Sequence, residues 1–335
     1  MRGRVVTLAT ARPRVYVVEA PGGRYVRAET HRELDRRGWQ PAPSPASADA
    51  LLIAGTLPDP LRAAADVLWS QLPGPRARAE PTAVSSVPST LDGLRACLRD
   101  RAGQLADRRG RELDEATRWL RSDSARHDET HHDDMDHDDM EHDDMAHDDM
   151  EMAPGGLVLA QGAPDRDGLE MDALRHPLGP LLDRWPGGLE LVTTLHGDVV
   201  VEAEVTWWEP PHPTAPPQTG RADDLAGGWD AAATVLSLLG DERQARLARS
   251  VAPSSPEVGG RVLRRLDRLT RRGALPRAAG EVLHTALADS VPALISDDEL
   301  VELVSGRDLG DVRLLVAAHA PLLQGVVDAS GSLDD

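Results

Sequence analysis

Cysteine is almost absent from this chain, since Cys97 is the only one among 335 residues. A single cysteine excludes a disulfide framework, a cysteine-based zinc site and a self-contained iron–sulfur cluster. Long apolar runs are absent too, and none approaches the about 18 residues that a transmembrane helix needs. Arg12, Pro13 and Arg14 interrupt any signal-peptide core near the N-terminus. We therefore expect a cytoplasmic protein without direct membrane insertion.

Lysine, asparagine and phenylalanine do not occur, and all 37 basic residues are arginine. These residue types have AT-rich codons, so their absence indicates GC-rich coding of the actinobacterial kind. A surface arginine of this chain often stands where another genome would encode lysine. We therefore interpret the arginine content as coding bias and not as function.

Negative charge is concentrated in one segment of the chain. The net charge is −19, of which residues 127–152 carry −13, with no arginine. Residues 1–126 carry +6 and residues 153–335 carry −12. This acidity argues against a nucleic-acid binder, which needs cations against phosphates. At about 150 residues per domain, we expect two domains joined by the acidic segment as a linker.

The first domain, residues 1–126, alternates strand and helix signals, which predicts a small α/β domain with a parallel sheet. The apolar run Ala50–Ala54 is typical of a strand covered on both faces. The other predicted elements are a strand at Arg14–Glu19, helices at Thr30–Arg37 and Leu61–Leu72, a possible strand at Val84–Val87 and one long helix from Ser89 to about Arg121.

The second domain, residues 153–335, is predicted to be α+β, with a β-hairpin followed by a helical bundle. Leu189–Leu195 and Val199–Trp207 flank His196-Gly197-Asp198 and form the hairpin, with Val199, Val201, Ala203, Val205 and Trp207 on one face. Ser296 and Glu299 match a capping box. Helices are predicted at 223–239, 241–250, 257–272, 279–289, 297–305 and 310–325.

The acidic segment contains four repeats of the pattern His-Asp-Asp-Met-x. Imidazole, thioether and carboxylate groups together suit copper, nickel or zinc ions. The candidate metal ligands are His127, His131, His132, Met135, His137, Met140, His142, Met145, His147 and Met150.

The spacing of these repeats argues against a preformed metal centre. On a helix, a step of five residues turns the next histidine by a net of about 140°, and on a strand it alternates faces. Two interpretations stay open. In both, the segment is a solvated, disordered low-complexity linker. In one it also binds copper, nickel or zinc, and in the other it binds no metal.

Other isolated residues give weaker signals. Cys97 shares helical spacing with Leu91, Leu94, Leu98 and Leu105, which predicts a buried, inert thiol. His176 and His196 are single histidines near turns and are interpreted as structural or solvated. Trp207 and Trp208 should point to opposite faces of the hairpin, so that the outward ring either marks a partner surface or packs at an edge.

Residues 13–100 resemble the small, cluster-bearing subunit shared by respiratory complex I (its 20 kDa, or B, subunit) and [NiFe]-hydrogenases. The stretch Ser47–Pro75 is similar to the family's strand "ADvlivaGT" with its following helix. Val87-Pro88-Ser89-Thr90 resembles the family's V-P-G-C-P-P. Where the family has cysteines, this chain has Ala20–Arg24, a shortened stretch around Arg76–Val84, and Ser89-Thr90. The resemblance therefore implies the family's fold without its iron–sulfur cluster.

The C-terminal part more weakly resembles the large (49 kDa, or D) subunit of complex I. His176-Pro177 and Gly188–Val205 correspond to the family's His-Pro turn and hairpin. The family's second histidine in that turn, associated with quinone, has no counterpart between Pro177 and Trp185.

Together the resemblances imply an accessory protein of NADH-quinone oxidoreductase or hydrogenase type, not catalytic alone. Its partners would be protein subunits of a redox complex, which would hold it at the inner face of the membrane. The alternative is a cytoplasmic copper-, nickel- or zinc-binding protein that acts through its repeats. Active quinone or electron chemistry is the reading with the least support, because the family's histidine and cysteines are missing.

Overall fold

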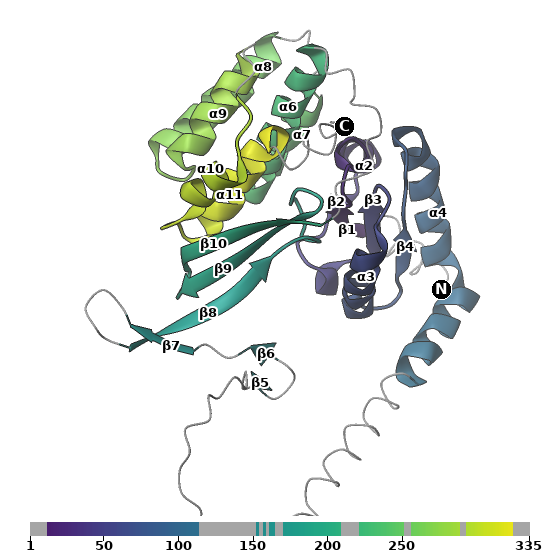
Figure 1. Ribbon diagram of the computed structural model, residues 1–335. Helices are drawn as coiled ribbons and strands as arrows, with labels where there is room; N and C mark the ends of the chain where they lie inside the picture. The colour runs from purple at the N-terminus through teal and green to yellow at the C-terminus, as the bar shows by residue number, and fades with distance from the viewer. Residues whose placement is uncertain are drawn as a thin grey trace, which may run out of the picture.

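The computed structural model describes two parts that pack against each other, an N-terminal α/β unit and a C-terminal unit of antiparallel sheet and helices (Figure 1). The described residues are 12–113, 152–153, 157–158, 161–164, 170–208, 221–250, 256–288 and 293–323. Of the predicted linker 127–152, only Met152 is among them. Within the described ranges, no helix has both the length and the apolar character needed to cross a membrane.

Four parallel strands form the N-terminal sheet in the order β2-β1-β3-β4, which confirms the predicted parallel α/β architecture. All five residues of β3 are buried, as a strand covered on both faces requires. The strands are β1 (Arg14–Glu19), β2 (Gln40–Pro41), β3 (Ala50–Ala54) and β4 (Ala77–Ala79).

Helices cover both faces of this sheet. Alternate residues of β1 and β3 pack against α2 and α4 on one face, and the intervening residues pack against α3 on the other. This alternation follows from the two-residue period of a strand. The helices are α2 (Arg24–Arg37), α3 (Asp59–Gln71) and α4 (Val87–Arg99).

The prediction of one uninterrupted helix from Ser89 is wrong, and its predicted end at about Arg121 lies outside the described residues. Helix α4 ends at Arg99, because Asp100 has a ψ of 94°, and a second helical segment covers residues 101–113. The break changes the phase of the apolar stripe, so Leu91, Leu94 and Leu98 are buried whereas Leu105 is 45% exposed.

Cys97 is exposed, so the prediction of a buried thiol is wrong. It lies one residue before the buried stripe position Leu98 and points away from the sheet. The strand suggested at Val84–Val87 is also wrong, because Val84–Ser86 is a short 3-10 helix and the sheet's fourth strand is β4.

The C-terminal sheet is antiparallel, in the order β10-β9-β8-β7, and its β9–β10 hairpin confirms the predicted one. Strand β8 contains His176-Pro177 and was not predicted. The strands are β5 (Met152–Ala153), β6 (Leu157–Val158), β7 (Gln161–Pro164), β8 (Glu170–Leu178), β9 (Leu189–His196) and β10 (Val199–Trp207).

A β-bulge between Val200 and Glu202 changes which residues of β10 face the core. Val200 is fully buried, whereas Val201 is 39% exposed. The inward face therefore continues through Ala203, Val205 and Trp207, as predicted, but Val199 and Val201 do not belong to it.

Six helices follow the hairpin in the described residues, and each overlaps a predicted one. The capping box at Ser296 is confirmed, because its hydroxyl accepts from the Glu299 backbone N–H at 3.3 Å and Glu299 reaches back to the Ser296 N–H at 2.7 Å. The helices are α6 (Arg221–Leu238), α7 (Glu242–Ser250), α8 (Pro256–Arg271), α9 (Arg277–Leu287), α10 (Asp297–Val304) and α11 (Leu309–His319).

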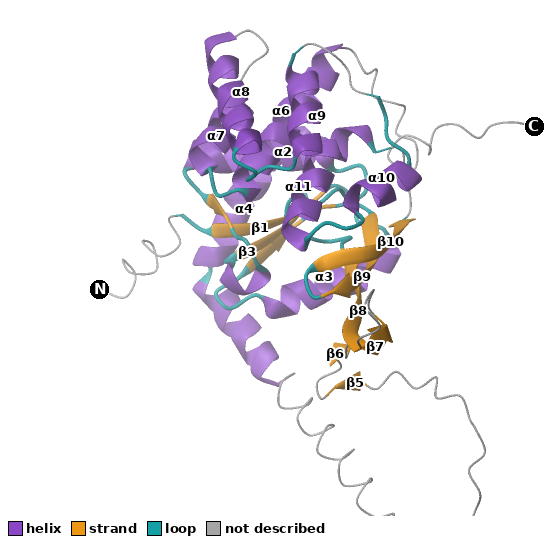
Figure 2. Ribbon diagram, turned by 90° about the vertical axis from the view of Figure 1, so that its left-hand side faces the viewer, coloured by secondary structure: helices purple, strands orange, loops and turns teal. Residues whose placement is uncertain are grey.

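The C-terminal helices divide between two apolar cores. Helices α6 to α9 pack together with α11, and α10 and α11 also cover the inner face of the antiparallel sheet. Figure 2 shows α6 to α9 at one end of the molecule and the short strands β5 to β7 at the other. Helix α7 lies against α2 of the N-terminal part, and α6 reaches α2 through an ion pair between Asp230 and Arg27.

Candidate functional site

The carboxyl ends of β1 and β3 form the point where the strand order of the parallel sheet reverses. The chain leads from β1 through α2 to β2 on one side, and from β3 through α3 to β4 on the other side. Open α/β sheets bind ligands at this kind of edge. Backbone segments meet closely here, because a Cβ at Gly23 would lie 1.8 Å from the Ala54 carbonyl oxygen, and Gly55 has a φ of +107°.

A turn from the C-terminal part covers this edge. The turn spans residues 179–188, between β8 and β9. Asp183 forms a bridge with Val18 of β1, and its backbone N–H donates to the Tyr16 hydroxyl at 3.2 Å. The Gly187 N–H donates to Glu19 Oε1 at 3.1 Å. The edge at which an α/β protein usually receives a ligand is therefore closed by the protein itself.

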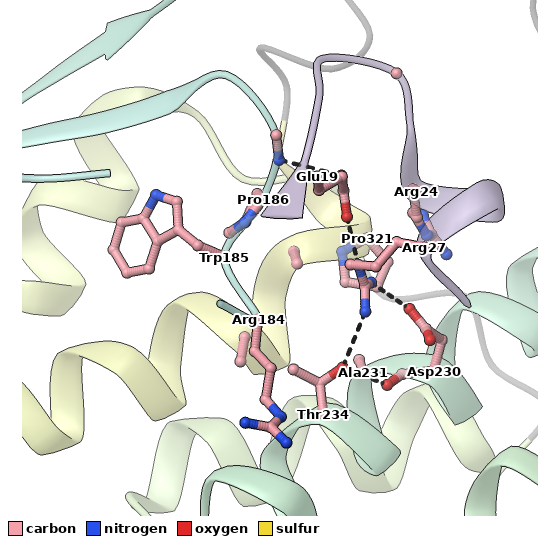
Figure 3. A pocket seen from close by; sticks show the side chains of 14 residues that line it. Glu19, Arg24, Arg27, Arg184, Trp185, Pro186, Asp230, Ala231, Thr234 and Pro321 are labelled. Atoms are coloured by element: carbon pink, nitrogen blue, oxygen red, sulfur yellow. Dashed lines mark hydrogen bonds and ion pairs between the residues drawn. The ribbon is translucent and has the colours of Figure 1, made fainter. Parts of the chain in front are cut away.

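A buried arginine links the two parts beside this turn. Arg27 of α2 donates from Nε to Glu19 Oε2 at 2.5 Å and from Nη2 to Asp230 Oδ2 of α6 at 2.6 Å. Its Nη1 also lies 3.5 Å from the Thr234 hydroxyl (Figure 3). The three charged residues are each less than 10% exposed. We call Glu19, Arg27 and Asp230 the ion network.

The ion network keeps its arginine charged. Burial opposes the charge, but Asp230 and Glu19 together raise the pKa of Arg27 above its ordinary value. A guanidinium held in this way cannot serve as a proton donor or acceptor at physiological pH. What the network provides is a fixed, charge-assisted connection between β1, α2 and α6.

A small cavity adjoins the ion network, with Arg24, Arg184, Trp185 and Pro321 in its lining. Its volume of about 40 Å³ accommodates a few water molecules. Substrate sites are roughly ten times larger. Arg184, which has a left-handed φ of 56°, pairs with Asp183 and with Glu242 at 3.2 Å, so its charge is engaged within the fold.

The residues at this edge do not fit an iron–sulfur cluster. Such clusters are held by cysteine thiolates, and the loop after β1, Ala20–Arg24, contains none. Ser89 stands in α4 and its hydroxyl donates to the Ser86 carbonyl at 3.0 Å, which is a local turn contact. The single thiol, Cys97, lies on the exposed side of α4.

The candidate metal ligands between His127 and Met150 all lie outside the described residues. In the part of the chain that the structure describes, no group of three His, Cys, Asp or Glu side chains is placed to hold a metal ion. His176 is exposed on β8 and His196 is partly exposed at the end of β9. Both agree with the interpretation of these histidines as structural or solvated.

The two hairpin tryptophans point to opposite sides, as predicted, and both are engaged within the chain. Trp207 packs against the core under α10, and its Nε1 donates to Asp297 at 3.0 Å. Trp208 packs against the apolar cluster of β1, β3 and α3, and its Nε1 donates to Glu190. The second ring thus lies between the two parts of this chain and is not a free partner surface.

Sequence reasoning missed the ion network. Glu19 directly follows the apolar run Val15–Val18 of β1, and a charged residue at that position was the one local signal available. Arg27 and Asp230 are separated by 203 positions in the chain, so no short motif contains both. No protein-family profile, curated protein or solved structure matches this chain.

Proposed function

We propose that this chain is an accessory subunit of a redox complex of the complex I or hydrogenase type, without an iron–sulfur cluster of its own. In this proposal a small-subunit-like part and a large-subunit-like part are fused in one chain. The observation that carries it is the ion network at the carboxyl end of β1, where a cluster-bearing relative would need thiolates.

The geometry supports a structural role for this edge. The turn 179–188 and the ion network occupy it, and the adjoining cavity has room for water only. Removing one member of a buried ion network leaves an uncompensated charge, so such a network strongly favours a single arrangement of the parts that it joins. A fixed arrangement of two parts suits a subunit that holds other subunits in place.

The coarse architecture supports the proposal as well. A four-stranded parallel sheet covered on both faces is followed by an antiparallel sheet with helices, in the order that the resemblance implies. The partners in this proposal are protein subunits of the redox complex, and the chain reaches the inner face of the cell membrane through them. Electron transfer would then belong to the partners' cofactors.

The test uses the full chain, tagged at one end and isolated from its native cells in mild detergent. The expected result is co-purification of redox-complex subunits in fixed stoichiometry, with no iron–sulfur absorbance or paramagnetic signal from the chain purified alone. An Arg27→Met variant, which breaks the ion network, should reduce co-purification. A stoichiometric cluster in the isolated chain, or the absence of any redox subunit, would overturn the proposal.

The repeats between residues 127 and 152 favour a second candidate function, the binding or delivery of copper, nickel or zinc. Six of the 12 histidines and five of the seven methionines of the chain lie in this segment. Calorimetry on a peptide of residues 127–152 should give binding at micromolar metal. Deletion of the same segment separates the functions: loss of metal handling with intact co-purification supports this candidate, and the reverse pattern contradicts it.

A further inference from the structure

Three residues on one face of α2 point toward the C-terminal part. Arg27, His31 and Asp35 are spaced by four, which places them on one face of the helix. Arg27 pairs with Asp230 of α6 at 2.6 Å, and Asp35 pairs with Arg249 of α7 at 2.7 Å. We call this contact between α2 and the helices α6 and α7 the seam. His31 lies in the seam, between two ion pairs that cross it.

His31 has no partner that could stabilise a proton. Its side chain is 5% exposed, and Nε2 is buried with no hydrogen-bond partner among the described residues. The charged groups that act on it are all cations: Arg249 from α7, Arg27 from α2 and Arg184 from the turn.

The carboxylates of the same region are already engaged by arginines. Asp35 is held by Arg249, and Asp230 by Arg27. Asp183 is held by Arg184, and Glu242 pairs with both Arg184 and Arg249. A protonated His31 would therefore add a fourth cation to a buried place where each of these carboxylates already pairs with an arginine, although Asp183 Oδ1 accepts no hydrogen bond from the described residues.

We propose that His31 is an acid-sensitive lock, which keeps the seam between the two parts of the chain closed while it is neutral and opens the seam when it binds a proton. The inference rests on the packing of α2 against α6 and α7 and not on the proposed function. It assigns a role in regulation to a residue that makes no contact with the ion network's carboxylates. Acidification of the surroundings would then separate α2 from the C-terminal helices while both parts stay folded.

The sign of the effect follows from the groups around the ring. Burial, followed by Arg249, Arg27 and Arg184, holds the pKa of His31 well below its ordinary value of about 6.5. An opened seam restores the ordinary value, so the opened state binds more protons below pH 6.5. The closed state therefore loses stability as pH falls below 6.5. Burial raises the pKa of Asp183, which opposes this loss, because the closed state then favours the protonated carboxyl.

The test measures how often the seam opens, by the reactivity of a thiol placed inside it. Thr234 of α6 is 7% exposed and contacts Arg27, so a Thr234→Cys substitution places a thiol in the seam. The native, exposed Cys97 serves as the internal reference for the pH dependence of thiol chemistry. The ratio of the two labelling rates in the full chain should rise between pH 7 and pH 5, by at most the about 25-fold that His31 alone supplies, because Asp183 opposes part of the rise.

Three controls are used. Two keep the Thr234→Cys thiol and change a histidine, and the third moves the thiol to position 50. His31→Gln, which cannot be protonated, should leave the ratio unchanged within threefold, and His31→Met replaces it if the glutamine variant is unfolded at pH 7 by circular dichroism. His319→Gln removes another buried histidine and should keep the full rise. Ala50→Cys, in place of Thr234→Cys, puts the thiol in strand β3 and should show no rise, because the sheet stays intact.

The outcomes decide the proposal directly. A rise at position 234 that depends on His31 and is absent at position 50 supports the lock. No rise in the chain with native His31, or the same rise in His31→Gln, would overturn it. An equal rise at positions 234 and 50 would mean that acid unfolds the whole chain, which also overturns a local opening.

Discussion

The parallel sheet and the seam are held together by different physical effects. Strand β3 buries five apolar residues between two layers of helices, and its stability comes from area removed from water. The seam joins α2 to α6 and α7 through charged groups, among them Arg27 and Asp230, whose net contribution is small because desolvation offsets their attraction. Burial of apolar area makes each part fold, whereas the charged pairs of the seam, together with the packing of Trp208, decide how the two parts fit together.

The largest effect should come from removing the cation of the ion network. Arg27→Met leaves Glu19 and Asp230 buried without a counter-charge, which should cost about 3–5 kcal/mol. Urea unfolding monitored by tryptophan fluorescence measures this loss. The matched control replaces all three members, with Glu19→Gln, Arg27→Met and Asp230→Asn, and should recover most of the stability. A loss below about 1 kcal/mol for Arg27→Met would contradict this prediction, because Glu19 and Asp230 would then tolerate burial without their cation.

A truncation in the sheet should have a similar cost for a different reason. Leu52 is fully buried in β3, and Leu52→Ala removes apolar contacts and leaves a cavity, at a cost of about 2–5 kcal/mol. Unlike Arg27→Met, this loss should be the same at low and high salt, since no charge changes. Unfolding curves at two salt concentrations compare the two variants. A salt-dependent loss for Leu52→Ala would contradict the conclusion that the sheet is stabilised by apolar burial and the seam by charge.

These differences explain which features the sequence could predict. The strands Arg14–Glu19 and Ala50–Ala54 were predictable because a run of apolar residues is a local signal. The contact between Arg27 and Asp230 was not, because it depends on how two distant segments meet in space. Strand β8 escaped prediction because its residues mix charged, polar and apolar types without a two-residue period.

The spacing of apolar residues also gave wrong predictions where the helix or strand backbone is irregular. Leu105 was placed on one helical stripe with Leu91, Leu94 and Leu98, but the helix breaks at Asp100 and Leu105 is 45% exposed. Val201 was assigned to the inner face of its strand, but the bulge moves it outward. In both cases the residue pattern is continuous and the backbone is not.

Replacement of Gly23 at the edge of the sheet should cause an intermediate loss of stability, which comes from close backbone contact and not from charge. A Cβ at Gly23 would meet the Ala54 carbonyl oxygen at 1.8 Å, so Gly23→Ala must push the loop after β1 away from β3. Overpacking of this kind costs about 1–3 kcal/mol. Thermal unfolding measures the loss. Gly93→Ala in α4 is the control, because its Cβ would meet no atom within 4 Å. Gly38→Ala is not a neutral control, because Gly38 has a positive φ. A Gly23→Ala variant as stable as Gly93→Ala would contradict the close contact.

The smallest predicted effect belongs to a helix end far from the seam. Ser296→Ala removes the hydroxyl that accepts from the Glu299 N–H at the start of α10, and loss of such a cap costs about 1 kcal/mol. Ser305 at the other end of α10 offers the control, because its hydroxyl donates only to the Val301 carbonyl within the same helix. Urea unfolding of both variants compares them. Because α10 packs on the antiparallel sheet and not on α2, Ser296→Ala should lower global stability and leave seam-thiol labelling at pH 7 unchanged. If labelling rose together with the loss of stability, the seam and the C-terminal core would open as one unit, and the distinction between the charged seam and the apolar cores would fail.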